Sequence, residues 1–321
     1  MEHDAIELLE KTSYGRGDYD KYYIDCSMYA NNSKHIETQE ILQNTQNKDV
    51  AILHAIATDD SIGRNRHIVV KISGFQKHNS MAEKEFQIGH QLHQFKLSGF
   101  MRFICLFPCF DDTSRASSKM KERAPPVSTN IQICNAKDHI LSNYKHVLVM
   151  PYLPIGSIAR YEWTVDNLGL LKTIAIHTVL SLANAFDKTG FLHNDLNWGN
   201  ILFKKTTIRE IAYEFDGATI TIPTNGYKIV ITDFEKVYWE PDNKRAFWMN
   251  ILMFFTRADI TNTAEQLIVW QKSKIEEFVI EMRDGNKPVR KIVKLIELIR
   301  KSVFDISDMT PTKPYDPNVY G

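Results

Sequence analysis

The sequence predicts an α+β fold in two parts, a β-rich first part followed by a mainly helical second part. Short β-branched runs recur through residues 37–153, and a long stretch with helical apolar spacing begins at Leu168. The last third of the chain contains no run with strand composition. The chain has 321 residues, enough for one two-lobed domain or two small ones. We expect residues 1–36 to form a polar tail and the two parts to join near residue 153.

The first part contains four segments with strand composition and one helix. β-branched and apolar residues fill Asp49 to Ala57 and Arg66 to Ser73, and the turn residues between them predict a hairpin. Ser80 is a good N-cap, so a helix is expected from Ser80 through Lys96. Apolar residues at 100–110 and 144–153 predict two further strands, separated by a polar loop over residues 111–130.

The second part is expected to consist mainly of helices. The first is predicted at Leu168 to Thr189, and three more at Ala246 to Phe255, Thr263 to Glu281 and Val289 to Phe304. The last of these has one apolar stripe opposite a basic face. Packing against a core is favoured for this stripe over contact with a membrane surface.

Composition excludes several classes of function. The 39 basic and 39 acidic side chains cancel, so the chain carries no electrostatic footprint for nucleic acid or an anionic membrane. Apolar runs such as Ile251 to Phe255 are far shorter than the ~20 residues of a membrane span. The polar N-terminus does not resemble a secretory signal, and four cysteines do not make a disulfide framework. We therefore expect an intracellular protein, in cytoplasm or nucleus, with no membrane and no direct nucleic-acid partner.

The segment that carries chemistry is Gly190 to Leu202, which reads G-F-L-H-N-D-L-N-W-G-N-I-L. Asp195 and Asn200 lie there in a polar loop, and Asp233 follows a second strand 33 residues after Asn200. Phosphoryl transfer from ATP needs a carboxylate to orient the attacking hydroxyl and accept its proton, and oxygen ligands for Mg²⁺. Asp195 fits the first role, and Asn200 and Asp233 fit the second. Turn and cap residues of an unrelated fold are the alternative, which the joint pattern disfavours.

This pattern resembles the protein-kinase superfamily, whose catalytic loop reads H-R-D-L-x-x-x-N and whose metal loop reads D-F-G. Within it, N-W-G-N-I-L at 197–202 and the insert before Tyr227 are similar to haspin-like atypical kinases, with a related layout in kinases of large DNA viruses, so a viral source is open. The resemblance implies a bilobal fold, with a small β-rich N-lobe and hinge at 37–153 and a larger mainly helical C-lobe at 154–321. It also implies ATP with Mg²⁺ or Mn²⁺, and a protein substrate phosphorylated on Ser or Thr.

The resemblance places the remaining parts of the site. Lys71 would contact the α- and β-phosphates and pair with Glu85, or with Glu83 in an alternative register. Glu85 has Gly89 one turn on, where such kinases usually have a bulky residue. Met150 would be the gatekeeper beside the adenine. The backbone of Pro151 to Leu153 would contact the ring, with the donor from Leu153 because proline has no N–H.

Several positions depart from the family pattern. Leu42 and Val50 match the ends of the phosphate loop, but its three glycines are missing between them. The loop arginine is replaced by Asn194, and the lysine common two residues after the catalytic aspartate by Asn197. Glu235 replaces the glycine of D-F-G. These changes keep two alternatives to an active Ser/Thr kinase open: a pseudokinase that acts as a binding module, and a small-molecule phosphotransferase.

Overall fold

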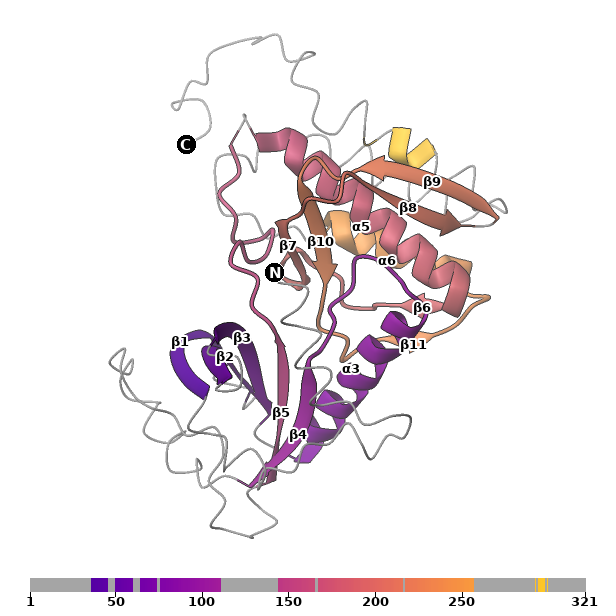
Figure 1. Ribbon diagram of the computed structural model, residues 1–321. Helices are drawn as coiled ribbons and strands as arrows, with labels where there is room; N and C mark the ends of the chain where they lie inside the picture. The colour runs from indigo at the N-terminus through magenta and orange to yellow at the C-terminus, as the bar shows by residue number, and fades with distance from the viewer. Residues whose placement is uncertain are drawn as a thin grey trace, which may run out of the picture. The chain divides into compact units, whose positions relative to one another are not determined.

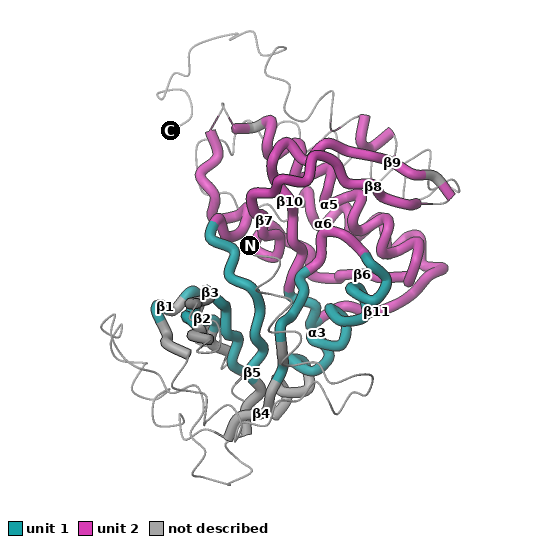
Figure 2. The backbone as a smooth tube through the Cα atoms, in the orientation of Figure 1, with its two compact units in different colours: residues 1–96, 101–154, 233–235 teal, residues 97–100, 155–232, 236–321 magenta. Residues whose placement is uncertain are grey.

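The computed structural model describes residues 36–45, 50–59, 64–73, 76–110, 144–164, 167–215 and 217–256, and from the C-terminal segment residues 292, 294–297 and 299. These residues form helices and sheets with one β-rich portion (Figure 1). The chain divides into two compact units (Figure 2). Unit 1 comprises residues 1–96, 101–154 and 233–235, and unit 2 comprises residues 97–100, 155–232 and 236–321. The expected tail, the polar loop at 111–130 and the helix at 263–281 fall outside the described residues, except for residue 36.

Unit 1 is built on a five-stranded antiparallel sheet in the order β1-β2-β3-β5-β4. Its strands are β1 (Ile36–Thr45), β2 (Val50–Asp59), β3 (Arg64–Ser73), β4 (Cys105–Phe110) and β5 (Tyr144–Pro151). The predicted β2–β3 hairpin is confirmed, although both strands run further toward the turn than expected. Because β3 is central, Lys71 lies between Ile52 on β2 and Leu148 on β5.

Helix α3 (Gln76–Gln94) packs against β4 and β5 of the same unit. Its buried positions lie on one face of the helix: Ala82, Glu85, Phe86, Ile88, Gly89 and Leu92. The prediction that this helix begins at Ser80 is wrong, because the helix already runs from Gln76. Serine has only a modest penalty inside a helix, so its capping preference did not decide the boundary.

Helix α5 (Leu168–Thr189) lies in the core of unit 2 and has the predicted bounds. It ends at Gly190, whose φ is 73° and whose N–H donates to the Phe186 carbonyl at 2.7 Å. A Cβ at Gly190 would lie 2.4 Å from the backbone nitrogen of Pro241, so this end of the helix requires glycine.

The stretch Gly169–Thr189 is long and apolar enough to cross a membrane by length and composition, and within the described residues it alone meets that test. Most of it is buried inside the protein, as expected for a core helix. The count of uninterrupted apolar runs missed this stretch, since polar residues such as Thr178 interrupt it.

Unit 2 also contains three two-stranded sheets. They pair β7 (Ile201–Lys205) with β10 (Tyr227–Ile231), β6 (Phe191–Leu192) with β11 (Tyr238–Trp239), and β8 (Glu210–Phe215) with β9 (Ala218–Pro223). The strand pair that precedes Asp233 was predicted, whereas the other two pairs were not. The β8–β9 hairpin runs alongside α5 (Figure 1). His177 of α5 holds the β8–β9 hairpin through two hydrogen bonds. Its Nε2 donates to the Pro223 carbonyl at 3.1 Å, and its Nδ1 accepts from the Tyr213 hydroxyl at 2.7 Å.

Two further predictions meet the structure in part. Helix α6 (Lys244–Thr256) covers the predicted 246–255 and begins after Asn243, whose Oδ1 accepts the Ala246 N–H at 2.8 Å. The strand expected at 100–110 starts only at Cys105, and Phe100 makes a single bridge to Ile231. In the C-terminal segment the described residues are helical, and four of them are buried, as a core stripe requires: Ile292, Leu295, Ile296 and Ile299.

Candidate active site

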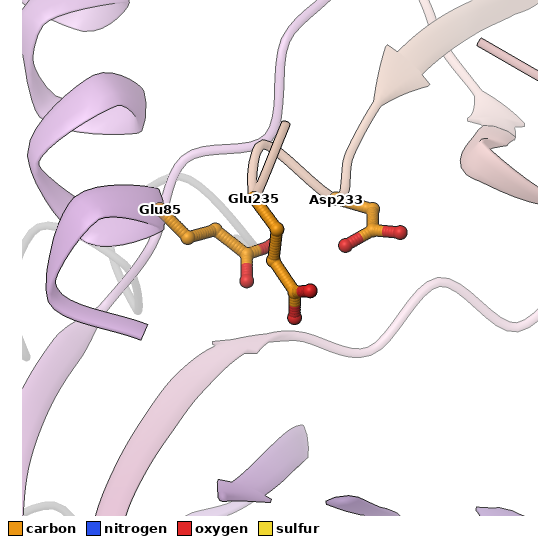
Figure 3. A group of neighbouring side chains, drawn as sticks. All are labelled: Glu85, Asp233 and Glu235. Carbon is orange, nitrogen blue, oxygen red and sulfur yellow. The ribbon is translucent and has the colours of Figure 1, made fainter. Parts of the chain in front are cut away.

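A buried lysine is the centre of a charged cluster in unit 1. The Nζ of Lys71 lies 2.7 Å from Oε2 of Glu85, 2.8 Å from Oε1 of Glu235 and 3.4 Å from Oδ1 of Asp233. The Lys71 and Glu85 side chains are 8% and 1% exposed, whereas those of Glu235 and Asp233 are 21% and 36% exposed. Figure 3 shows the three carboxylates, Glu85 from α3 and the other two from the turn after β10. Among these four residues, Asp233 and Glu235 are therefore the ones that a ligand can reach most easily.

Local structure explains why these groups meet. Lys71 is on the central strand and Glu85 is on the inward face of α3. Asp233 has φ of 67°, a left-handed conformation that aspartate tolerates better than most residues. Between the two acidic residues, Phe234 is fully buried and meets the Phe103 ring edge to face at a centroid distance of 5.8 Å. The buried ring anchors the turn that presents both carboxylates to Lys71.

The Lys71 ammonium contacts three carboxylates, so acidic groups outnumber basic ones in this cluster. This imbalance affects the pKa values of Lys71 and Glu85. Burial alone would lower the pKa of Lys71, but the three carboxylates, Glu85 foremost, raise it above its ordinary value and keep the amine charged. Burial raises the pKa of Glu85 from 4.5 to about 7, against the lowering effect of Lys71. Burial is the largest cause of this rise in pKa, and the negative charges of Asp233 and Glu235 add to it, so the one Lys71 ammonium does not offset them.

The structure places Glu85, and not Glu83, against Lys71. The bulky residue expected one turn after Glu85 is supplied from elsewhere in unit 1. A Cβ built on Gly89 would lie 2.5 Å from Cδ2 of Phe103, so the Phe103 ring fills the space beside the glycine. This ring also contacts Phe86, at a centroid distance of 6.4 Å.

The carboxylates of this cluster are suitable ligands for a hard cation. Glu85, Asp233 and Glu235 each offer an oxygen, and these oxygens lie within 4.8 Å of one another. Mg²⁺ and Mn²⁺ prefer oxygen ligands of this kind. Because Glu85 is buried against the Lys71 ammonium, the more exposed Asp233 and Glu235 are the better candidates.

A second group of predicted residues lies in unit 2. The amide Nδ2 of Asn200 donates to the backbone carbonyl of Asp195 at 3.0 Å, and Asn197 donates to the same carbonyl at 3.2 Å. The Asp195 side chain is 21% exposed, and its Oδ2 accepts from Nζ of Lys236 at 2.7 Å. The structure thus brings Asp195 and Asn200 together in unit 2, and Lys71, Glu85 and Asp233 together in unit 1.

The loop that carries Asp195 is anchored at several points within unit 2. His193 is fully buried, and its Nε2 donates to the Thr232 carbonyl at 2.9 Å. Asn194 has φ of 58°, and its N–H donates to Oδ1 of the buried Asn250 at 2.6 Å. The indole of Trp198 donates to the Phe254 carbonyl at 2.7 Å. Two of these anchors come from α6, so this helix fixes the backbone on both sides of Asp195.

Strand pairing links the loop to the residue before Asp233. β7 and β10 pair with Ile201 opposite Ile231. Immediately beyond that pair, the Thr232 N–H donates to the Asn200 carbonyl at 3.0 Å. With this register the chain leaves β10 at Thr232, directly before Asp233, as the predicted strand pair requires.

The residues predicted to bind the nucleotide lie in or beside the sheet of unit 1. Met150 is buried on β5 opposite Val69, and Pro151 ends that strand opposite Ile68. Leu153 is buried just after it, and the Tyr152 N–H donates to the His67 carbonyl at 3.4 Å. Leu42 lies within β1, and Val50 begins β2 opposite Thr45. The predicted phosphate-loop segment is therefore partly strand, and its turn, residues 46–49, lies outside the described residues.

Three contributors to the site were missed or misjudged by reasoning from the sequence. The sequence motifs treat Glu235 only as the missing glycine of D-F-G, give Lys236 no role and place Phe103 in a predicted strand. The sequence signal was present for the first two, because consecutive Glu and Lys residues follow D-F directly.

Comparisons with known proteins find atypical kinases, as the motifs predict. The family model described as "ABC1 atypical kinase-like domain" matches residues 113–267, a range that includes Asp195, Asn200 and Asp233. Serine/threonine-protein kinase haspin of mouse (Mus musculus) is 38% identical over 77 residues, covering 24% of this chain and 10% of the mouse protein. Haspin of cattle (Bos taurus) is 37% identical over 70 residues, covering 22% of this chain and 9% of the bovine protein.

This chain resembles the haspin-like atypical kinases. A Caenorhabditis elegans protein, ZK177.2, is also 35% identical over 94 residues, covering 29% of this chain and 32% of that protein. The chain thus spans about a tenth of the length of the two haspins and about a third of the nematode protein. The haspin-like resemblance predicted from the motifs is confirmed.

Proposed function

We propose that this haspin-like protein is an ATP- and Mg²⁺-dependent protein kinase that phosphorylates Ser or Thr of a protein substrate. The contact of Lys71 with both Glu85 and Asp233 carries this proposal. An ammonium held between a buried acid and an exposed metal-ligating acid is placed to neutralise a phosphate group bound beside it. The two mammalian relatives are named serine/threonine-protein kinases, which supports a hydroxyl acceptor.

Each of the other predicted residues has one role in the reaction. Asp195 orients the acceptor hydroxyl and takes its proton. The hydroxyl oxygen forms the new bond to the γ-phosphorus, and the bond from this phosphorus to the β–γ bridging oxygen breaks, so ADP leaves with that electron pair. Asp233 and Asn200 would hold Mg²⁺, which neutralises charge on the phosphates.

The adenine is assigned to the segment after β5. The Tyr152 amide already donates to His67, so the Leu153 N–H remains our assigned donor to the ring, with Pro151 as an acceptor. In this assignment unit 1 acts as the small β-rich N-lobe and unit 2 as the larger C-lobe.

A pseudokinase is the second candidate, and one observation favours it. Glu235 places a carboxylate 2.8 Å from Lys71, on the side of the cluster where a phosphate would have to bind. A protein with Lys71 permanently occupied in this way would serve as a binding module and not as an enzyme.

The deciding assay uses purified protein, labelled ATP, Mg²⁺ and mixed protein acceptors, with labelled Ser or Thr as the readout. We expect label transfer that EDTA abolishes. Asp195→Asn should reduce kcat on the order of 100-fold or more while nucleotide still binds, because the hydroxyl loses its base. The matched control, Asp242→Asn, changes an exposed aspartate before α6 and should retain activity. Nucleotide binding without any transfer by the wild type would favour the pseudokinase, and label only on a small molecule would contradict a protein acceptor.

A further inference from the structure

Lys236 is a charged residue at the candidate base that no predicted motif includes. Its Nζ lies 2.7 Å from Oδ2 of Asp195, and it follows the D-F-E segment directly. We propose that Lys236 is the cation that stabilises the transferring phosphoryl group beside Asp195, in place of a lysine within the catalytic loop. This inference rests on the proposed kinase function.

The chemistry needs a positive charge at this place. Negative charge spreads over the three equatorial oxygens of a phosphoryl group in transfer, and fixed cations that face those oxygens accelerate the step. The loop from His193 to Asn200 contains no lysine or arginine. Its Asn197, at the position where a lysine is common, uses its amide within the loop to bind Gly199 and the Asp195 carbonyl. The loop itself therefore supplies no cation to the acceptor hydroxyl.

The distance from Lys236 to Asp195 is short enough for this role. A hydroxyl oriented by a carboxylate lies about 2.6–3.2 Å from it, and the reacting oxygen and phosphorus are about 3–3.5 Å apart. An ammonium in contact with the carboxylate is thus within three contact distances of the phosphorus: one to the carboxylate, one to the hydroxyl oxygen and one to the phosphorus. The lysine side chain has four rotatable bonds. The ammonium can therefore move from the carboxylate to a phosphoryl oxygen while the backbone stays in place.

The backbone of Lys236 is fixed while its side chain is exposed. The neighbouring residues Phe234 and Val237 are both fully buried, and they hold the backbone on either side of Lys236. The Lys236 side chain is 54% exposed. An ion pair with this exposure contributes little to stability, because water screens it. The contact is thus weak enough for the ammonium to exchange one oxygen partner for another during a catalytic cycle.

The reaction step remains balanced with Lys236 in this role. The hydroxyl proton goes to Asp195, the electron pair of the broken P–O bond leaves with ADP, and Lys236 keeps its own proton throughout. Its contribution is purely electrostatic, so the positive charge, and not merely a hydrogen-bond donor, should be required.

The test compares Lys236→Met, Lys236→Gln and Lys236→Arg with Lys244→Met, which changes an exposed lysine at the start of α6. Loss of one transition-state contact costs about 100- to 1000-fold in kcat. We expect losses in this range for Lys236→Met and Lys236→Gln, a loss within about tenfold for Lys236→Arg, and wild-type kcat for Lys244→Met. The Kd for ADP should change less than about threefold in all four variants, because ADP lacks the transferred group.

Glutamine can still donate a hydrogen bond to Asp195. Wild-type kcat in Lys236→Gln would therefore mean that Lys236 acts only as a hydrogen-bond donor, and it would overturn the inference. A kcat within threefold of wild type in Lys236→Met would also overturn it. If Lys236→Met does not fold, Lys236→Gln and Lys236→Arg decide by their contrast in charge. A wild-type protein without transfer activity would instead overturn the proposed function, and this inference with it.

Discussion

The packing of Phe103 over Gly89 gives a prediction whose sign runs against the usual rule for helices. Replacing a helical glycine with alanine normally stabilises a protein by about 0.5–1 kcal/mol. At Gly89 the added Cβ would lie 2.5 Å and 2.6 Å from two ring carbons of Phe103. Phe103 is 4% exposed and packs on Phe86 and Phe234, so its ring cannot retreat into solvent. We therefore expect Gly89→Ala to destabilise the protein.

The expected magnitude follows from two opposing effects. Overpacking a well-filled core costs about 1–3 kcal/mol. After the helix-propensity gain is subtracted, a net loss of about 0.5–2 kcal/mol in the free energy of unfolding remains. Urea unfolding with an unchanged m-value would measure it. In a Phe103→Leu background the space beside Gly89 opens, so the same alanine should be neutral or stabilising, with a coupling energy of about 1 kcal/mol or more.

Gly169→Ala is the matched control for the glycine substitution itself. Gly169 lies in the first turn of α5, and a Cβ built there meets no atom within 4 Å. Alanine at this position should stabilise the protein by its helix propensity alone. If Gly89→Ala stabilises the protein as much as Gly169→Ala does, Phe103 does not fill the space beside Gly89, and our explanation of the missing bulky residue is refuted.

Two further predictions concern the charges around Lys71. A unit charge about 4 Å from another is worth about 4 kcal/mol at an effective dielectric of 20 and about 1 kcal/mol in water. Glu235→Gln removes such a charge beside the phosphate site, so we expect metal-free ATP to bind about tenfold tighter by calorimetry, and unchanged or weaker binding would count against repulsion by Glu235. Because the pKa of Glu85 is raised from 4.5 to about 7, the folded state keeps a proton that the unfolded state has lost. The free energy of unfolding should therefore fall by on the order of 1–3 kcal/mol as pH rises through that window, and this fall should be absent in Glu85→Gln.

The parts of the fold that the sequence predicted well are those with a long or repeated pattern. Helix α5 has its predicted bounds because its apolar spacing persists to Thr189 and a glycine follows. The short strands β6 and β11 have two residues each, too few for any alternation to be visible. Helix α3 begins four residues before Ser80, because serine has only a modest penalty inside a helix and its capping preference alone does not set the boundary.

The candidate site was predictable where the backbone alone sets the position of a group. Glu85 is on the helix face that packs on the sheet, and Lys71 is on its central strand, so their contact follows from the pattern of burial. The contacts of Glu235 and Lys236 depend instead on how the chain leaves Asp233, whose left-handed backbone redirects the residues after it. Their place directly after D-F marks both residues as candidates, but no periodicity encodes that turn, so the partners of their side chains could not be predicted from the sequence.

A departure from a motif is judged by whether another residue performs the physical role of the usual one. The catalytic loop needs an acceptor for the N–H of the left-handed Asn194, and the amide oxygen of Asn250 provides it at 2.6 Å without the charge of an aspartate. The space beside Gly89 needs a bulky group, and Phe103 provides it from another segment. By the same criterion, Asn197 alone does not argue for a pseudokinase, since an ammonium reaches Asp195 from Lys236. Glu235 is the departure that remains informative, because it adds a charge that opposes phosphate binding, and its carboxylate contacts Lys71, the same ammonium that a phosphate would need.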